Sequence, residues 1–218
     1  ADKPTTANRC KRLFSTMWNH ARGWGYTDSE NPCKGIMGHA LKKRDVYITD
    51  TVFEAVYAHA SAQLADALDM AYLTGQRIGD LLAMEWSQIT DDGIAFKPSK
   101  TSGSTGARII VGWSPKLRDV VARLRALKIE RVAFTRKVIT TQDGQPYTYS
   151  GAQTAWKRAV KRAGVRNVHF HDIRAKAVTD VDQVSGRRAA RSMGAHSTEG
   201  QTADYIRNRK AEPVKATR

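Results

Sequence analysis

The chain has 218 residues, with 36 lysines and arginines against 21 aspartates and glutamates, and a formal net charge of +15 at pH 7. A hydrophobic fraction of 41% and a charged fraction of 26% are sufficient for a folded core and exclude a disordered tail or a fibrous protein. No apolar run approaches the roughly 20 residues of a membrane-spanning helix, and the first residues contain no apolar signal segment, so we expect neither a membrane span nor a signal peptide.

The positive charge is concentrated in the second half of the chain. Residues 1–100 contain 12 basic and 12 acidic side chains, whereas residues 101–218 contain 24 and 9. A strongly positive segment attracts anionic partners, of which nucleic acid is the most common. The charge distribution therefore favours a nucleic-acid-binding protein, with a solvated basic surface as the alternative.

Helical spacing of apolar residues opens the chain. Leu13, Met17 and Trp24 recur at the period of a helix, which predicts an amphipathic helix over residues 5–22 that ends at Gly23. The following turn-rich stretch and a basic LysLysArg run at residues 42–44 predict a linker.

A new unit begins after this linker. Thr49 is a candidate N-cap for a helix over residues 51–60. A second helix is predicted over residues 62–73 and is broken by Gly75, and a third, short one starts near Arg77.

The apolar period then changes from 3.6 to 2. Residues 93–98 and 107–113 predict two strands of a hairpin, and residues 131–134 and 147–149 are possible short strands or extended segments. Further helices are predicted over residues 115–127, 150–163, 172–184, 187–193 and 198–207. The expected fold class is α+β, mostly helical, with a small antiparallel sheet.

Several kinds of chemistry have no support in the sequence. The glycine-rich nucleotide-binding motifs, HExxH and GxSxG are absent, so the sequence does not support nucleotide-driven or triad-hydrolase activity. His169 and His171 form an HxH pair without a third ligand at useful spacing, so we expect no metal and no cofactor. Cys10 and Cys33 lack CxxC partners, which excludes a zinc ribbon and fits a reducing compartment.

Five short motifs stand out because of their order along the chain. They contain Arg77 (ThrGlyGlnArg), Lys100 (ProSerLysThr), His171 and Arg174 (HisAspIleArg), His196 (MetGlyAlaHisSer) and Tyr205 (AlaAspTyrIleArg). This set, with the tyrosine nine residues after the last histidine, resembles the tyrosine recombinase (phage integrase) family. The resemblance covers roughly residues 45–210. It implies a catalytic tyrosine recombinase domain over residues 45–218, preceded at residues 1–44 by the last helix of a core-binding domain and its linker.

Two positions depart from the family pattern. Ala195 precedes His196 where the family usually has glycine, and AlaLysAla follows HisAspIleArg where many members have a polar or aromatic residue and threonine.

The resemblance implies a role for each side chain in DNA cleavage. Tyr205 is the nucleophile that attacks a phosphodiester, and Arg77 and Arg174 are the clamp for the negative charge that builds on its oxygens. An arginine suits this because its planar fork donates two hydrogen bonds and keeps its proton. His171 would move a proton to or from the tyrosine, whose hydroxyl is otherwise a poor nucleophile at neutral pH.

Two further roles complete the implied chemistry. His196 would donate to a non-bridging phosphate oxygen, and Lys100, on a flexible hairpin, would protonate the leaving 5′ oxygen. The expected product is a 3′-phosphotyrosyl bond and a free 5′-hydroxyl, a step that requires neither ATP nor a metal.

Each side chain also has a structural interpretation when considered alone. Arg77 could pair with Asp80 at a helix start, and His171 with Asp172 could form a helix cap. The lysine could be an ordinary exposed residue of a hairpin, and the tyrosine a half-buried aromatic side chain. Their joint order and spacing favour the catalytic interpretation.

Basic residues also cluster outside these motifs. Within the helix predicted over residues 150–163, like charges are spaced four residues apart, which destabilises an isolated helix and which a bound polyanion would relieve. We expect phosphate contacts from Arg158, Lys161, Arg162 and Arg166, and similar ones from Arg187, Arg188 and Arg191. A solvated face is the alternative.

The sequence therefore predicts a site-specific recombinase, most similar to phage or mobile-element integrases. The expected partner is double-stranded DNA with attachment-type sites. The expected assembly is a homotetramer on DNA and a monomer without it, with possible accessory DNA-bending proteins and no membrane. The expected location is the bacterial host cytoplasm or nucleoid. A chromosome-dimer-resolving recombinase and a catalytically inactive DNA-binding module remain as alternatives.

Overall fold

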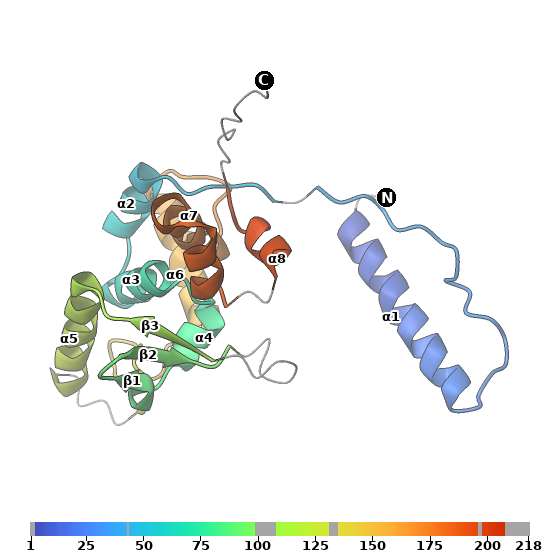
Figure 1. Cartoon of the computed structure of the whole chain (residues 1–218), viewed down its shortest axis with the longest axis horizontal. Coiled ribbons are helices and arrows are strands. Elements are labelled where there is room, and N and C mark those ends of the chain that lie inside the picture. The colour runs from blue at the N-terminus through green and yellow to red at the C-terminus, as the bar shows by residue number, and fades with distance from the viewer. Residues whose placement is uncertain (1–2, 43, 99–107, 131–134, 196–197, 208–218) are drawn as a thin grey trace, which may run out of the picture. The chain divides into compact units, whose positions relative to one another are not determined.

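The computed structural model describes residues 3–42, 44–98, 108–130, 135–195 and 198–207, and the chain divides into two compact units, Ala1–Arg44 and Asp45–Arg218 (Figure 1). In the part that the structure describes, no helix is both long and apolar enough to span a membrane.

The first unit is built on helix α1 (Pro4–Gly23), as the apolar spacing predicts. A proline in its first turn suits a helix start, because its missing N–H has no partner there. The chain then returns along the helix, and the side-chain amide of Asn31 donates to the carbonyl of Ser15 at 3.0 Å. No residue of α1 is buried, and Leu13 and Met17 are exposed.

The second unit is mostly helical. Its helices are α2 (Asp50–Ala58), α3 (Ala62–Thr74), α4 (Ile78–Ala83), α5 (Pro115–Glu130), α6 (Tyr149–Arg162), α7 (His171–Met193) and α8 (Glu199–Ala203). Helix α3 packs against α4, α5, α6 and α7, which makes it the centre of the core. Its buried side chains include Leu64, Leu68 and Met70, and the hydroxyls of Thr49 and Ser61 cap α2 and α3 as N-caps do.

A three-stranded antiparallel sheet lies beside α5 (Figure 1). Its strands are β1 (Ile89–Thr90), β2 (Gly93–Phe96) and β3 (Ile109–Gly112), in that order. In β2 and β3, Phe96 pairs with Ile109 and Gly93 with Gly112. A 3-10 turn, η1 (Trp86–Gln88), leads into the sheet. The predicted class, mostly helical with a small antiparallel sheet, is confirmed.

Three details differ from the sequence-based expectations. Residues 147–149 form no strand: Thr148 is extended, and its hydroxyl caps α6 by accepting from the Gly151 N–H at 3.1 Å. Strand β1 (Ile89–Thr90) was not predicted, whereas the helices predicted over residues 172–184 and 187–193 both form, in α7 on either side of a kink at Gly186, whose φ is +81°. The last expected helix ends at Ala203. The possible strand over residues 131–134 lies outside the described residues.

An ionic cluster around the buried side chain of Lys176 fixes α7 against the start of the second unit. The ammonium of Lys176 donates to Asp50 at 2.5 Å and to Asp180 at 2.8 Å, and its side chain is only 1% exposed. The hydroxyls of Tyr47 and Tyr72 donate to the same Asp180 carboxylate. Burial acts to lower the pKa of Lys176, but the hydrogen bonds of its ammonium to Asp180 and Asp50 outweigh burial and raise that pKa. The amine therefore stays charged. The cluster holds α7 in place for the side chains that it carries.

Candidate active site

A tight turn between α3 and α4 presents Arg77. Gly75 ends α3 with φ +64°, and a Cβ there would lie 2.9 Å from the Cγ of Met193. Glycine is therefore required both for the left-handed backbone and for the close approach. Arg77 then occupies the N-cap position of α4, and its guanidinium lies 3.8 Å from Asp80. This is the pair at a helix start that was the structural alternative to a catalytic role.

The first turn of α7 carries His171 and Arg174 on one face, because residues three apart are neighbours on a helix. The carboxylate of Asp172 accepts from the His169 N–H at 2.8 Å and so fixes the helix start. Arg174 is 2% exposed, and its guanidinium donates to the carbonyls of Gly75 at 2.6 Å and of Gly194 at 2.5 Å. Arg174 therefore ties the Arg77 turn to the far end of its own helix.

Tyr205 follows α8 and is held in place by its neighbours. Ile206 is buried against Val178 of α7, and the Tyr205 carbonyl lies 3.3 Å from the hydroxyl of Thr179. The Tyr205 hydroxyl lies 3.2 Å from Nε2 of His171. The Arg174 guanidinium carbon lies 5.1 Å from the centre of the tyrosine ring, a cation–π contact.

Burial and neighbouring positive charges disfavour the charged forms of Arg174 and His171. Burial lowers the pKa of Arg174, and the charge of Arg77 lowers it further, whereas Tyr205 acts to raise it. Burial also lowers the pKa of His171, as do the charges of Arg174, Arg77 and Arg207, against a smaller opposing effect of Asp172. His171 is therefore neutral near pH 7, and the like charges of the arginines favour an anionic ligand.

Four of the six predicted site residues are described, and they lie in this one region: Arg77, His171, Arg174 and Tyr205. Lys100 and His196 lie outside the described residues. Among the residues that are described, no three His, Cys, Asp or Glu side chains gather in a way that could hold a metal.

Sequence reasoning missed the backbone part of the site. Nothing in the HisAspIleArg motif indicates that its arginine binds two carbonyls, and Gln76 was not singled out. Ala195 has φ +47°, a left-handed backbone that glycine adopts at lower cost. This conformation gives a physical reason for the glycine that the family usually has at that position.

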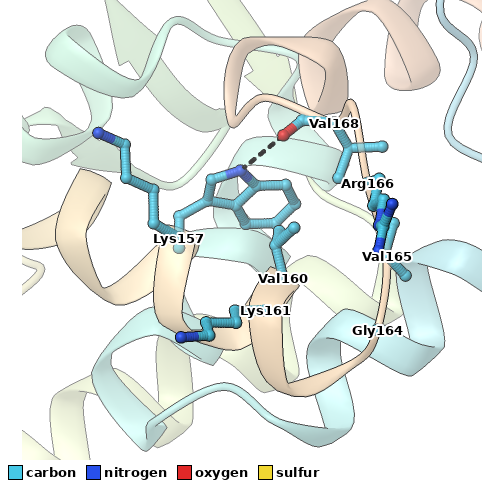
Figure 2. Close-up of a pocket in the computed structure, with 8 residues that line it drawn as sticks. Lys157, Val160, Lys161, Gly164, Val165, Arg166 and Val168 are labelled. Carbon is cyan, nitrogen blue, oxygen red and sulfur yellow. Dashed lines mark hydrogen bonds between the residues drawn. The ribbon is translucent and has the colours of Figure 1, made fainter.

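A basic pocket lies on α6 and the segment after it, with a volume of about 370 Å³. Lys157 and Lys161 extend from the helix on one side, and Arg166 lies on the following segment on the other (Figure 2). The remaining lining is mostly apolar and includes Trp156, whose indole N–H donates to the Val168 carbonyl at 3.4 Å. Lys157, Arg158, Lys161, Arg162 and Arg166 are all exposed.

Comparisons with known proteins agree on one family. The chain matches the model of the phage integrase family over residues 47–212. It is 27% identical over 188 residues to a shufflon-specific DNA recombinase of Escherichia coli, covering 81% of this chain and 44% of that protein. It is 24% identical over 221 residues to an integrase of Escherichia phage HK022, covering 96% of this chain and 60% of that protein. The chain thus spans about half the length of the curated relatives it matches.

A solved structure shares the fold. A lambda integrase tetramer bound to a Holliday junction matches with a TM-score of 0.83 and 18% identity, covering 98% of this chain and 63% of that chain.

Proposed function

Because the chain belongs to the phage integrase family, we propose that it cleaves and rejoins DNA strands at specific sites, through a covalent bond between Tyr205 and a 3′-phosphate. The observation that carries this proposal is the Tyr205 hydroxyl 3.2 Å from His171 Nε2, beside the buried guanidinium of Arg174. A nucleophile, a neutral base and a fixed cation are what an attack on a phosphodiester needs.

The proposed cleavage needs no cofactor, because the protein's own side chains account for every bond and proton. The Tyr205 oxygen forms a bond to phosphorus while the bond to the 5′ oxygen breaks, and the tyrosine proton passes to Nε2 of His171. Arg77 and Arg174 stabilise the charge on the non-bridging oxygens, joined in this role by His196. Lys100 supplies the proton to the departing 5′-hydroxyl. Rejoining is the same step in reverse, with the energy of the phosphodiester kept in the phosphotyrosyl bond.

We also propose domain limits, a DNA substrate, an assembly and a cellular location for the reaction. We assign residues 45–218 as the catalytic domain and residues 1–44 as the end of a core-binding domain with its linker. We infer that the substrate is a double-stranded attachment-type site, on which four copies assemble from monomers with the help of DNA-bending proteins. The reaction would take place in the cytoplasm or nucleoid of a bacterial host, and integration or excision of a phage or mobile element is the favoured outcome.

A trapping assay tests the activity. A nicked half-site loses the short 5′-hydroxyl fragment after cleavage, so the covalent adduct accumulates and survives denaturant. We expect an adduct that forms equally in EDTA, and peptide mapping that places the phosphate on Tyr205. Failure to form the adduct on DNA that the protein demonstrably binds would falsify the proposed activity.

The lowered pKa of His171 predicts the pH dependence of cleavage. A base must be neutral to accept the tyrosine proton, and the neutral fraction rises with pH through the pKa of His171, which lies below its ordinary value of about 6.5. Cleavage measured at sub-saturating DNA should therefore rise with pH, reach half its maximum below pH 6.5 and stay level near pH 7. His171→Gln should be slow at every pH and lack this acid limb. A rate that falls as pH rises from 5 to 7 would mean that His171 acts as an acid instead.

The basic pocket predicts how binding responds to salt. If Lys161 and Arg166 each contact one phosphate, replacing both by glutamine removes two contacts and lowers the slope of log K against log salt by about 1.8. We expect weaker binding but an unchanged cleavage rate at saturating DNA, because neither residue contacts Tyr205. The control is Lys116→Gln, an exposed lysine of α5 in a pocket that also contains Asp50 and Glu54. An unchanged salt slope in the double variant would place the DNA elsewhere.

A further inference from the structure

The backbone beneath the site consists of two turns in close contact. One connects α3 to α4 at residues 74–77, and the other ends α7 at residues 193–195. The side chain of Met193 lies against Gly75, with the Cγ atom 2.9 Å from where a Cβ would be. Two side chains join these turns by hydrogen bonds, and they do so from different places in the chain.

The first of these side chains is Arg174, which touches the nucleophile. Its two donations, to Gly75 and Gly194, cross from one turn to the other. Because its guanidinium also lies over the Tyr205 ring, Arg174 both binds the turns together and belongs to the reacting groups.

The second is Gln76, which is part of the arginine turn itself. Its side-chain amide donates to the carbonyls of Thr74 at 3.0 Å and of Met193 at 2.9 Å. Both amide hydrogens are thereby used, and a flipped amide would set its oxygen against two carbonyl oxygens, so the orientation is fixed. The residue is 1% exposed, and a buried amide held at two points is a rigid spacer between the turns.

The next residue in the chain is Arg77. Its backbone sits at the N-cap of α4, with φ −69° and ψ 141°, and its guanidinium lies 3.8 Å from the Asp80 carboxylate. The placement of the Arg77 guanidinium therefore depends on where the backbone of the turn is held. The Gln76–Met193 hydrogen bond holds that backbone to α7, the helix that carries His171 and Arg174.

We propose that Gln76 is a positioning residue for strand cleavage, which fixes Arg77 relative to the groups on α7 by joining the 74–77 turn to the carbonyl of Met193. The inference rests on the proposed function, because it concerns the efficiency of that reaction. Gln76 does not touch the scissile phosphate in this account and acts only through Arg77.

The test is a double-mutant cycle between Gln76 and Arg77. Gln76→Met keeps the length of the side chain but removes both donations. We expect single-turnover cleavage of the nicked half-site to fall roughly 10- to 100-fold, the size of effect that a small misplacement of a catalytic group produces, with the DNA dissociation constant changed less than about twofold. In the Arg77→Ala background, the same Gln76→Met substitution should lower the cleavage rate by less than about twofold. The incubations must be long enough to measure cleavage by the slower Arg77→Ala protein. Gln153→Met on α6 is the matched control and should cleave as wild type does.

The outcomes separate the two proposals. Wild-type protein that binds DNA but gives no adduct overturns the proposed function. Wild-type adduct with full activity of Gln76→Met overturns the positioning role alone. A loss that persists undiminished in the Arg77→Ala background also overturns it, because such a loss comes from general destabilisation. If Gln76→Met does not fold, Gln76→Glu is measured in the same double-mutant cycle, because it keeps the shape of the side chain and has at most one donor. A loss of cleavage that is undiminished in the Arg77→Ala background would again overturn the positioning role.

Discussion

Replacing Tyr205 by phenylalanine should abolish the covalent protein–DNA adduct, lowering cleavage by at least about a thousandfold. The substitution removes the one atom that forms the bond to phosphorus and leaves the ring under the Arg174 guanidinium, 5.1 Å from its centre. The hydroxyl loses its 3.2 Å contact with His171 and its hydrogen bond with the Arg174 guanidinium, so the free energy of unfolding should fall by about 1–3 kcal/mol. Non-covalent DNA binding should persist.

The measurement is denaturing gel electrophoresis of the nicked half-site reaction, with band-shift binding on the same samples. Tyr149→Phe is the control, because Tyr149 is exposed at the start of α6 and should form adduct at the wild-type rate. An adduct from Tyr205→Phe would show that another tyrosine is the nucleophile. Loss of binding together with the adduct would show that Tyr205 holds the fold instead.

Local signals in the sequence predicted most of the elements and the described part of the site. Thr49 is the N-cap that its residue type indicates, and Gly75 ends α3 in the left-handed conformation that favours glycine. The HisAspIleArg spacing puts His171 and Arg174 on one helix face, as the 3.6-residue period requires. These features depend on residues within a few positions of one another, which is why the sequence alone reveals them.

Features that depend on distant parts of the chain were missed or mistaken. The TyrThrTyr segment at residues 147–149 has high strand propensity, yet Thr148 caps α6 and the segment enters a helix. The carbonyls that Arg174 binds, from Gly75 and Gly194, are 119 residues apart in the chain, and no local pattern pairs them.

Arg174→Lys should be the second most damaging change, although it keeps the charge. The arginine fork reaches the carbonyls of Gly75 and Gly194 simultaneously, at 2.6 and 2.5 Å, whereas an ammonium is a single point donor. One buried carbonyl would lose its partner, which costs about 1–3 kcal/mol of stability. A lysine amine in this buried position beside Arg77 would also lose its proton more easily, since burial already lowers the pKa of the guanidinium itself.

Cleavage by Arg174→Lys should therefore fall by about 100- to 1000-fold, because the phosphate loses a charge-assisted donor in the transition state. Thermal unfolding gives the loss of stability, and the cleavage rate is measured well below the unfolding midpoint so that the two effects are separated. Arg125→Lys, an exposed change of the same kind on α5, should alter neither quantity. If Arg174→Lys were less stable yet cleaved DNA at the wild-type rate, Arg174 would serve only to hold the two turns together, and the charge on the phosphate would have to be stabilised by Arg77 and the remaining groups.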